Sequence, residues 1–182
     1  MLLTTERLVL RRFRPSDAES LAAYRTLPEV ARYQSWQSPY PVEKARYAIE
    51  TMAAMDPDEP GWFQYAVELT GGGAHIGDVG VNLHDNRRQA DIGYTLAPQW
   101  QGRGYATEAV RAVLEHLFRV KGLHRVSAEC DARNGASYRL LERVGFQREG
   151  LLRRHSWVDG EWTDDLLYGI LETDFFGIET QS

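Results

Sequence analysis

The sequence contains only one cysteine, Cys130, among its 182 residues. A single cysteine cannot form a disulfide bond within the chain, so the sequence gives no sign of the disulfide-stabilised class of secreted proteins. Residues 1–13 carry four charged side chains and lack the apolar run of a secretory signal peptide. These absences favour a cytoplasmic protein.

Long apolar runs and an excess of positive charge are also absent. No stretch approaches the ~20 apolar residues that a membrane-spanning helix needs, so no membrane partner is expected. The chain has 21 Lys and Arg against 26 Asp and Glu, which gives a net charge of −5. It therefore lacks the basic surface typical of nucleic-acid-binding proteins, and no nucleic-acid partner is expected.

The remaining composition is that of an ordinary globular protein. Hydrophobic residues make up 43% and charged residues 26% of the 182 residues, a length that suits one domain with a substantial core. No repeat, low-complexity stretch or linker divides the sequence. We expect a single domain over residues 1–182.

The first sixty residues predict one strand followed by two helices. Leu8 and Leu10 alternate with arginines, as in a strand with one buried face. Ser16 and Glu19 have the spacing of a capping box and predict the start of the first helix. The second helix is expected from Pro41, a residue that suits the first turn of a helix.

The rest of the chain alternates between strand and helix patterns. Segments bounded by turn residues predict strands, and apolar spacings of three and four residues predict helices. The expected strands are 62–69, 74–83, 90–96, 125–131, 146–158 and 162–171, and the expected helices are 105–121 and 134–145. Asp159-Gly160 is a strong signal for a hairpin between the last two strands. The order of elements predicts one mixed α/β domain.

The most informative segment is Trp100 to Thr107, where a glycine-containing loop leads from a strand into a long helix. Glycines allow positive φ and a close approach of the backbone to a ligand. The first turn of a helix offers N–H groups without helical partners and the positive end of the helix dipole, so a pyrophosphate would fit there. Arg103 adds a charge and Thr107 a hydroxyl. A tight turn with no ligand explains the local pattern equally well.

Two other phosphate-binding patterns fail at this loop. A dinucleotide fingerprint would need a third glycine where Thr107 stands, and no βαβ unit precedes the loop. A Walker loop would need a Gly-Lys-Ser/Thr sequence, which is absent.

Several motifs together resemble one known family. Gln101-x-x-Gly104-x-Ala106 resembles the Q/R-x-x-G-x-G/A signature of the GNAT N-acetyltransferases, and residues 134–146 resemble that family's N-x-x-S … GF element. Residues 5–11 and 159–164 are similar to the RimJ/RimL branch in particular. The resemblance covers nearly the whole chain. It implies a GNAT-like fold, with a central twisted, mostly antiparallel sheet of about seven strands, about four flanking helices and splayed strands at the CoA site.

The resemblance also implies acetyl-CoA as the acyl donor. In such proteins a bulged strand, here Tyr94 to Leu96, splays away from the next strand, here Val126 to Cys130, and the pantetheine arm lies in the gap. The loop would hold the pyrophosphate, and Asn134 would contact the pantetheine arm or simply cap its helix. The implied cofactor-binding residues are Leu96, Gln101, Gly102, Arg103, Gly104, Tyr105, Ala106, Thr107 and Asn134. No cluster of His and Cys at ligand spacing is present, so no metal is expected.

The implied reaction is direct attack of a primary amine on the thioester in a ternary complex. Many relatives carry a tyrosine as the acid seven residues after the asparagine, and that position is Leu141 here. Ser137 is the nearest hydroxyl at a motif position, either as a hydrogen-bond donor to the thiol sulfur or as an ordinary residue of a first helical turn. Asp91 and His155 are the candidate bases, and each has a purely structural alternative.

The acceptor is expected to be an amine, and the segment from Leu27 to Pro41 is expected to shape its pocket. Tyr33, Trp36 and Tyr40 in this segment could bind a cation or pack in the core. Three hypotheses stay open: acetylation of a protein N-terminus, such as that of a ribosomal protein; acetylation of an aminoglycoside, polyamine or amino-acid derivative; and a non-catalytic CoA-binding sensor. Succinyl or another acyl group in place of acetyl, and a monomer or a homodimer, stay open as well.

Three further residues are expected to be structural. Cys130 is interpreted as a small buried apolar residue rather than a nucleophile. Arg11 and Arg12 are expected on a solvated strand edge.

Overall fold

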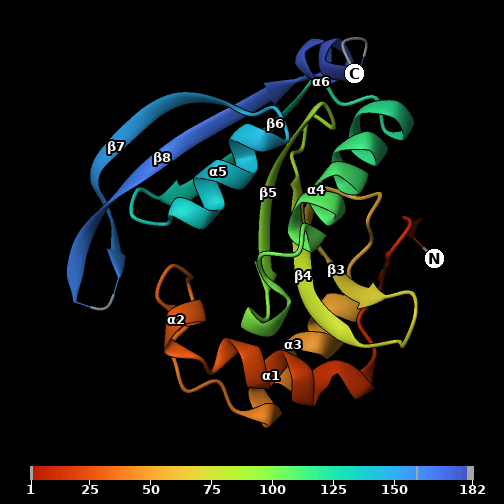
Figure 1. The fold of residues 1–182 in the computed structure, drawn as a ribbon, viewed down its shortest axis with the longest axis vertical. Helices are drawn as coiled ribbons and strands as arrows, with labels where there is room; N and C mark the ends of the chain where they lie inside the picture. Colours follow the sequence, from red (N-terminus) through yellow and green to blue (C-terminus); the bar gives the residue numbers. More distant parts are fainter. Residues whose placement is uncertain (1, 159, 180–182) are drawn as a thin grey trace.

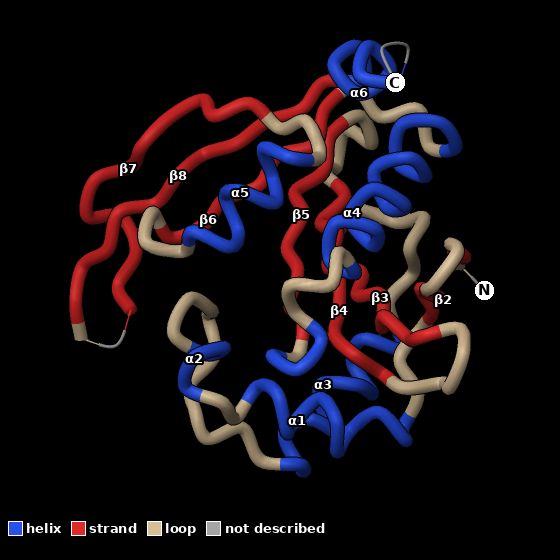
Figure 2. Tube along the Cα trace, in the orientation of Figure 1, coloured by secondary structure: helices blue, strands red, loops and turns tan. Residues whose placement is uncertain are grey.

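The computed structural model describes residues 2–158 and 160–179. All strands in this part of the chain belong to one sheet of eight strands in the order β1-β2-β3-β4-β5-β6-β8-β7 (Figures 1 and 2). Neighbouring strands are antiparallel except β5 and β6, which are parallel. The strands are β1 (Leu3–Thr4), β2 (Leu8–Arg11), β3 (Gly61–Leu69), β4 (His75–Leu83), β5 (Gln89–Leu96), β6 (Arg125–Asp131), β7 (Gln147–Val158) and β8 (Glu161–Leu171).

Six helices accompany this sheet in the described part of the chain. They are α1 (Ala18–Arg25), α2 (Pro28–Ala31), α3 (Val42–Ala54), α4 (Tyr105–Glu115), α5 (Gly135–Arg143) and α6 (Glu172–Glu179). The predicted mixed α/β fold is confirmed. The two-residue strand β1, the four-residue helix α2 and the eight-residue helix α6 were not predicted. Strand β1 and helix α2 are too short to show a clear periodicity. No helix among the described residues is long and apolar enough to cross a membrane.

The main core lies between the sheet and helices α4 and α5 (Figure 1). The predicted helical spacing of α4 is seen directly, since Val110, Val113 and Leu114 are fully buried against the sheet. Helix α4 continues through one π-helical turn, His116–Val120. Burying one such aliphatic side chain contributes about 1.5–3 kcal/mol, so this row fixes α4 on the sheet. The start of α4 is thereby held next to the end of β5.

Strand β2 is joined to the start of helix α1 by a buried ion-pair cluster. Arg11 is only 6% exposed, and its guanidinium donates to both carboxylate oxygens of Asp17 at 2.7 and 2.8 Å and to Glu68 at 2.6 Å. The expectation that Arg11 lies on a solvated edge was therefore wrong. The predicted capping box was also misplaced, because the Asp17 carboxylate, rather than Ser16 and Glu19, accepts a hydrogen bond from the Arg14 backbone N–H at 2.7 Å.

Strands β5 and β6 pair over only three positions and then separate. The pairs are Gln89–Arg125, Ala90–Val126 and Asp91–Ser127. Beyond them β6 stays in register with β8 through Asp131, while β5 stays in register with β4 through Leu96. The predicted splayed strands are confirmed. The expected bulge is not seen in the pairing of β5 with β4, because each strand simply follows its other neighbour.

The last two strands form the predicted hairpin. Val158 of β7 lies opposite Glu161 of β8, and Gly160 adopts a φ of +84°, which suits glycine. Asp159, the other residue of the predicted turn, lies outside the described residues. Figure 1 shows the hairpin reaching past the end of α5 toward α2.

Candidate active site

A cavity of about 570 Å³ opens where β5 and β6 separate. Its walls come from the ends of these two strands, the first turn of α4, helix α5, and α2 with the residues that follow it. Among the residues predicted for cofactor binding, those that line it are Leu96, Gln101, Gly102, Gly104, Tyr105, Ala106, Thr107 and Asn134. Arg103 does not line it, and its guanidinium lies 5.3 Å from the centre of the Trp100 ring. Ser137 also lines the cavity, whereas Asp91 and His155 do not.

The loop before α4 has the backbone conformation that its glycines predict. Gly102 and Gly104 have φ values of +72° and +82°, and Gly104 is the N-cap of the helix. The first helical hydrogen bond of this turn is donated by Glu108 to the Gly104 carbonyl at 3.0 Å, so the preceding N–H groups have no helical partner. The Gln101 side chain donates to the Leu96 carbonyl at 2.8 Å and ties the loop to the end of β5. The result is a helix N-terminus that faces the cavity and favours an anion.

Two hydroxyl groups meet at the opposite wall of the cavity. The Tyr94 hydroxyl on β5 lies 2.9 Å from the Ser137 hydroxyl in the first turn of α5 and 3.1 Å from the Ser137 carbonyl. Asn134 caps this helix, because its side-chain oxygen accepts from the Ser137 N–H at 3.2 Å. Burial raises the pKa of Tyr94, so its phenol keeps its proton at neutral pH. Leu141, at the position where a tyrosine was considered, is buried in the core.

A second cavity of about 450 Å³ adjoins the first and shares four residues with it, Tyr33, Gln34, Glu129 and Cys130. Its other walls come from the segment after α2 and from the β7–β8 hairpin. Trp36 lines this cavity, and its ring covers the Arg25 guanidinium at 4.3 Å. Tyr40 is buried in the core. Of the three aromatic residues expected either to bind a ligand or to pack in the core, Tyr33 and Trp36 therefore line a cavity, and Tyr40 packs in the core.

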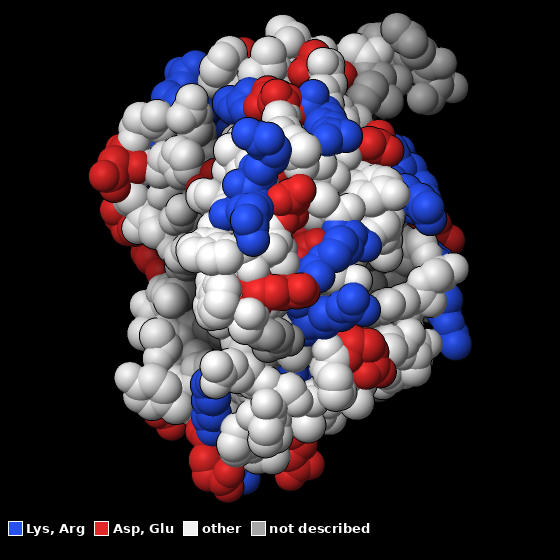
Figure 3. All heavy atoms as spheres, turned by 90° about the vertical axis from the view of Figure 1, so that its left-hand side faces the viewer, with Lys and Arg blue, Asp and Glu red and all other residues white. Residues whose placement is uncertain are grey.

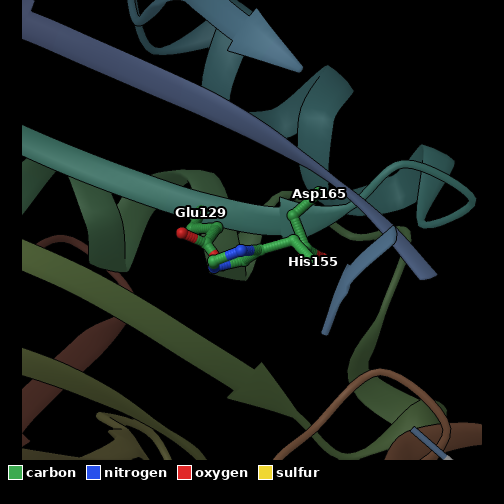
Figure 4. A group of neighbouring side chains, drawn as sticks. All are labelled: Glu129, His155 and Asp165. Atoms are coloured by element: carbon green, nitrogen blue, oxygen red, sulfur yellow. The ribbon is translucent and has the colours of Figure 1, made fainter. Parts of the chain in front are cut away.

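Three ionisable side chains from three neighbouring strands converge beside the second cavity (Figure 4). They are Glu129 of β6, His155 of β7 and Asp165 of β8, and their potential ligand atoms all lie within 4.8 Å of one another. Glu129 Oε1 is 4.0 Å from His155 Nε2. Burial raises the pKa of Glu129, the charge of Asp165 raises it further, and His155 opposes both effects. The same group could attract a metal ion or a protonated amine.

A bulge in β7 gives His155 its position. The register of β7 against β8 shifts between Leu152 and Ser156, and Arg154 within this stretch has a φ of +50°. The Asp164 carboxylate accepts a hydrogen bond from the Arg154 N–H at 2.7 Å and holds the bulge. Bulges commonly change the direction of a side chain, and here the bulged residues include His155.

The comparisons with known proteins agree with this arrangement. The family described as "Acetyltransferase (GNAT) domain" matches residues 7–147. The chain belongs to the GNAT acetyltransferases. It is 34% identical over 172 residues to the uncharacterized N-acetyltransferase YoaA of Bacillus subtilis (strain 168). The aligned region covers 94% of this chain and 97% of that protein.

Two further relatives extend the comparison. A GNAT-family acetyltransferase structure from Bacillus anthracis superposes with a TM-score of 0.86 at 28% identity and covers 94% of this chain and 99% of the other. The [ribosomal protein uS5]-alanine N-acetyltransferase of Escherichia coli (strain K12) is 33% identical over 84 residues, 46% of this chain and 43% of that enzyme. A GNAT enzyme uses acetyl-CoA, so this chain is an acetyl-CoA-dependent N-acetyltransferase.

The predicted base Asp91 lies outside both cavities of this acetyltransferase. It is the last residue of β5 that pairs with β6, and its carboxylate contacts His84 Nε2 at 2.9 Å and Asn82 at 3.2 Å. Glu129, which lines both cavities, was not predicted. One signal was available, because Glu129 lies on the strand that was expected to splay and only five residues before Asn134.

Cys130 was expected to be a small buried apolar residue; it is half-buried and lines both cavities. Burial raises the pKa of its thiol to about 11. The thiol is therefore protonated at neutral pH, which does not suit a nucleophile.

Proposed function

We propose that this N-acetyltransferase acetylates the α-amino group at the N-terminus of a protein or peptide, and that the donor and the acceptor occupy the two adjoining cavities. The observation that carries this proposal is the shared boundary of the cavities at Glu129 and Cys130. A donor in the first cavity and an amine in the second would meet at this boundary. That arrangement is what direct transfer in a ternary complex requires.

The first cavity has the features that acetyl-CoA needs. The backbone edge of β5 after Asp91 is not paired with β6 and can hydrogen-bond to the amide groups of a pantetheine arm. The loop from Gln101 to Thr107 and the start of α4 would bind the pyrophosphate. N–H groups of β5 near Leu96 would stabilise the oxyanion that develops on the thioester carbonyl.

Glu129 is the proposed general base. The acceptor arrives as an ammonium ion and must lose two protons: one passes to Glu129 and then to solvent, and the second ends on the CoA thiol. A carboxylate with a raised pKa accepts a proton more readily than an ordinary one at neutral pH. His155 and Asp165 would adjust this pKa in opposite directions.

Ser137 is the proposed donor to the leaving group. As the new C–N bond forms and the C–S bond breaks, its hydroxyl would donate a hydrogen bond to the sulfur, and Tyr94 would orient that hydroxyl. A thiolate is a good leaving group, so such help is modest. Asp91 is not proposed in this reaction because it contacts His84 and Asn82 outside the cavities.

The second cavity supports an acceptor with one ammonium group attached to a longer chain. Of the three carboxylates that line it, Asp131 is already paired with Arg133 at 2.7 Å. Asp165 is buried and accepts a hydrogen bond from Ser156 Oγ at 2.6 Å, so the more exposed Glu129, beside His155, is the carboxylate proposed to meet the acceptor. Trp157, which lines the cavity, is 60% exposed and could contact the residues that follow the amine.

On the face that contains the hairpin, the described residues carry charged side chains of both signs (Figure 3). Basic and acidic side chains are interspersed over much of that face (Figure 3). A polyamine with several charges would be favoured by a uniformly acidic groove. The partial identity with the uS5-alanine enzyme agrees with a peptide acceptor.

Release of the CoA thiol with a panel of acceptors tests this proposal. The panel contains peptides that begin with alanine or serine, the same peptides with a blocked α-amine and an internal lysine, and spermidine and an aminoglycoside. We expect turnover with the free α-amine peptides and at least about tenfold lower kcat/KM with the other acceptors. Preferred turnover of a polyamine or aminoglycoside would replace the peptide acceptor with a small amine. No turnover of any acceptor despite acetyl-CoA binding would favour a sensor.

A further inference from the structure

A carboxylate lies in the first turn of the helix that is proposed to bind the pyrophosphate. Glu108 is the fourth residue of α4, and its side chain is 18% exposed. Burial raises the pKa of Glu108, but hydrogen bonds from Thr5 and Arg7 more than offset this, so the pKa is lowered and the group is ionised. A negative charge here stabilises the helix by itself, but it would repel a bound pyrophosphate.

Arg7, in the turn between β1 and β2, compensates this charge. Its guanidinium contacts Glu108 Oε2 through Nε and Nη2, both at 2.6 Å, and its backbone N–H donates to Glu108 Oε1 at 3.0 Å. Thr5 Oγ1 donates to the same Oε1 at 2.5 Å. Both oxygens of the carboxylate are thus occupied by groups from the N-terminal segment.

The same arginine also contacts the loop itself. Its Nη1 donates to the Arg103 carbonyl at 3.1 Å, and its guanidinium lies 4.6 Å from the centre of the Tyr105 ring. A Cβ atom at Gly104 would lie 3.3 Å from its Nη2. Arg7 therefore contacts Arg103 and Tyr105, on either side of the N-cap Gly104, without lining the cavity.

We propose that Arg7 is a positioning residue for acetyl-CoA: it cancels the charge of Glu108 and holds the loop from Arg103 to Tyr105 in the conformation that accepts the pyrophosphate. This inference rests on the proposed pyrophosphate site. Two N–H groups directed at one carboxylate oxygen and a third directed at a carbonyl are suited to the planar guanidinium, and a lysine cannot provide all three. The contribution of Arg7 belongs to donor binding and leaves the chemistry at Glu129 unchanged.

Steady-state kinetics of Arg7→Gln test the inference. We expect the KM for acetyl-CoA to rise about tenfold with kcat nearly unchanged, because a like charge in the first turn opposes the anion. Added salt should reduce this difference by screening the charge. The double variant Arg7→Gln/Glu108→Gln should recover most of the lost affinity, and Arg7→Lys should recover part of it.

Arg87 provides a matched control. Like Arg7, it binds one carboxylate and one backbone carbonyl: Glu59 at 2.5 Å and the Asp58 carbonyl at 2.7 Å. It lines neither cavity. Arg87→Gln should leave the KM for acetyl-CoA unchanged. Acetyl-pantetheine, a donor without the pyrophosphate, gives a second readout: its turnover should be the same in Arg7→Gln and the wild type. Equal losses with acetyl-CoA and acetyl-pantetheine would show a general structural defect and overturn the inference.

Gly104→Val separates this inference from the proposed site. If Gly104→Val binds CoA as the wild type does, the loop does not hold the pyrophosphate, and both proposals fail. If Gly104→Val loses CoA binding while Arg7→Gln retains a wild-type KM, the site stands and the role of Arg7 is contradicted. Loss of affinity in both, with recovery in the double variant, is the result that the inference predicts.

Discussion

The hydroxyl groups of Tyr94 and Ser137 lie 2.9 Å apart at the wall of the first cavity. They come from strand β5 and helix α5, which the separation of β5 and β6 places on the two sides of one cavity. The relatives' tyrosine position is occupied by Leu141, which is buried and cannot donate a proton. The Tyr94–Ser137 pair therefore supplies hydroxyl groups that Leu141 cannot.

Removal of the Ser137 hydroxyl should slow turnover without weakening donor binding. We expect Ser137→Ala to lower kcat about tenfold and to leave the Kd for CoA unchanged, because the hydroxyl acts on the leaving sulfur. Tyr94→Phe should have a smaller effect of the same kind. In the double variant the effects should not add, since Tyr94 is proposed to act through Ser137. Unchanged kcat in Ser137→Ala would remove this residue from the mechanism.

The pH dependence of kcat/KM should identify Glu129 as the base. Glu129 accepts a proton only when it is ionised, so activity should fall as the pH drops through its pKa, which lies above the ordinary 4.5. Glu129→Gln should lower kcat at pH 7 about a hundredfold and abolish this acid limb. An unchanged acid limb in Glu129→Gln would assign the base elsewhere.

Two neighbours of Glu129 should move the acid limb in opposite directions. The charge of Asp165 raises the pKa of Glu129, so Asp165→Asn should shift the limb to lower pH. His155 lowers that pKa, so His155→Gln should shift the limb to higher pH. Shifts of the same sign in both variants would contradict the electrostatic coupling of these three neighbouring side chains (Figure 4).

The Arg11–Asp17 pair should make a large contribution to stability. Both side chains are buried, so Asp17→Asn leaves a buried guanidinium with less charge compensation and should lower the free energy of unfolding by about 3 kcal/mol. Burial raises the pKa of Asp17, but the bonds from Arg11 and Arg14 more than offset it, so the folded-state pKa lies below the ordinary 3.8. The stabilisation is thus complete above the unfolded-state pKa and is lost as the pH falls through the folded-state pKa.

Chemical denaturation at several pH values measures this effect. The difference between Asp17→Asn and the wild type should be constant near neutral pH and shrink below about pH 3.8. The exposed pair Arg87–Glu59 provides the control, since Glu59→Gln should cost less than about 1 kcal/mol. Equal losses in both variants would contradict the importance of burial.

Much of the fold could be predicted from local pattern. The buried Leu8 and Leu10 of a strand, the helical spacing of Val110, Val113 and Leu114, and the glycine turns agree with the structure. The splayed strands followed from the family resemblance and are confirmed by the three-residue pairing of β5 with β6. These features are local or belong to a family, so one sequence is enough to reveal them.

The details of the site depend on contacts between distant segments, which local pattern does not encode. Glu129, His155 and Asp165 become neighbours only through the order β6-β8-β7. Arg11 is buried because Asp17 and Glu68 reach it from two other elements. Arg7 and Glu108 are 101 residues apart in the sequence and share one ion pair.

Calorimetric titration of a bisubstrate conjugate tests most directly whether donor and acceptor occupy the two adjoining cavities. In this conjugate, CoA is linked through an acetyl bridge to the α-amine of an alanine peptide. If the donor and the acceptor occupy adjoining cavities, the conjugate should bind at least about a hundredfold more tightly than CoA, because the second group binds without a further loss of translational freedom. Gly104→Val should weaken CoA and the conjugate alike, and Trp157→Ala should weaken only the conjugate. A conjugate that binds no more tightly than CoA would contradict transfer between the two cavities.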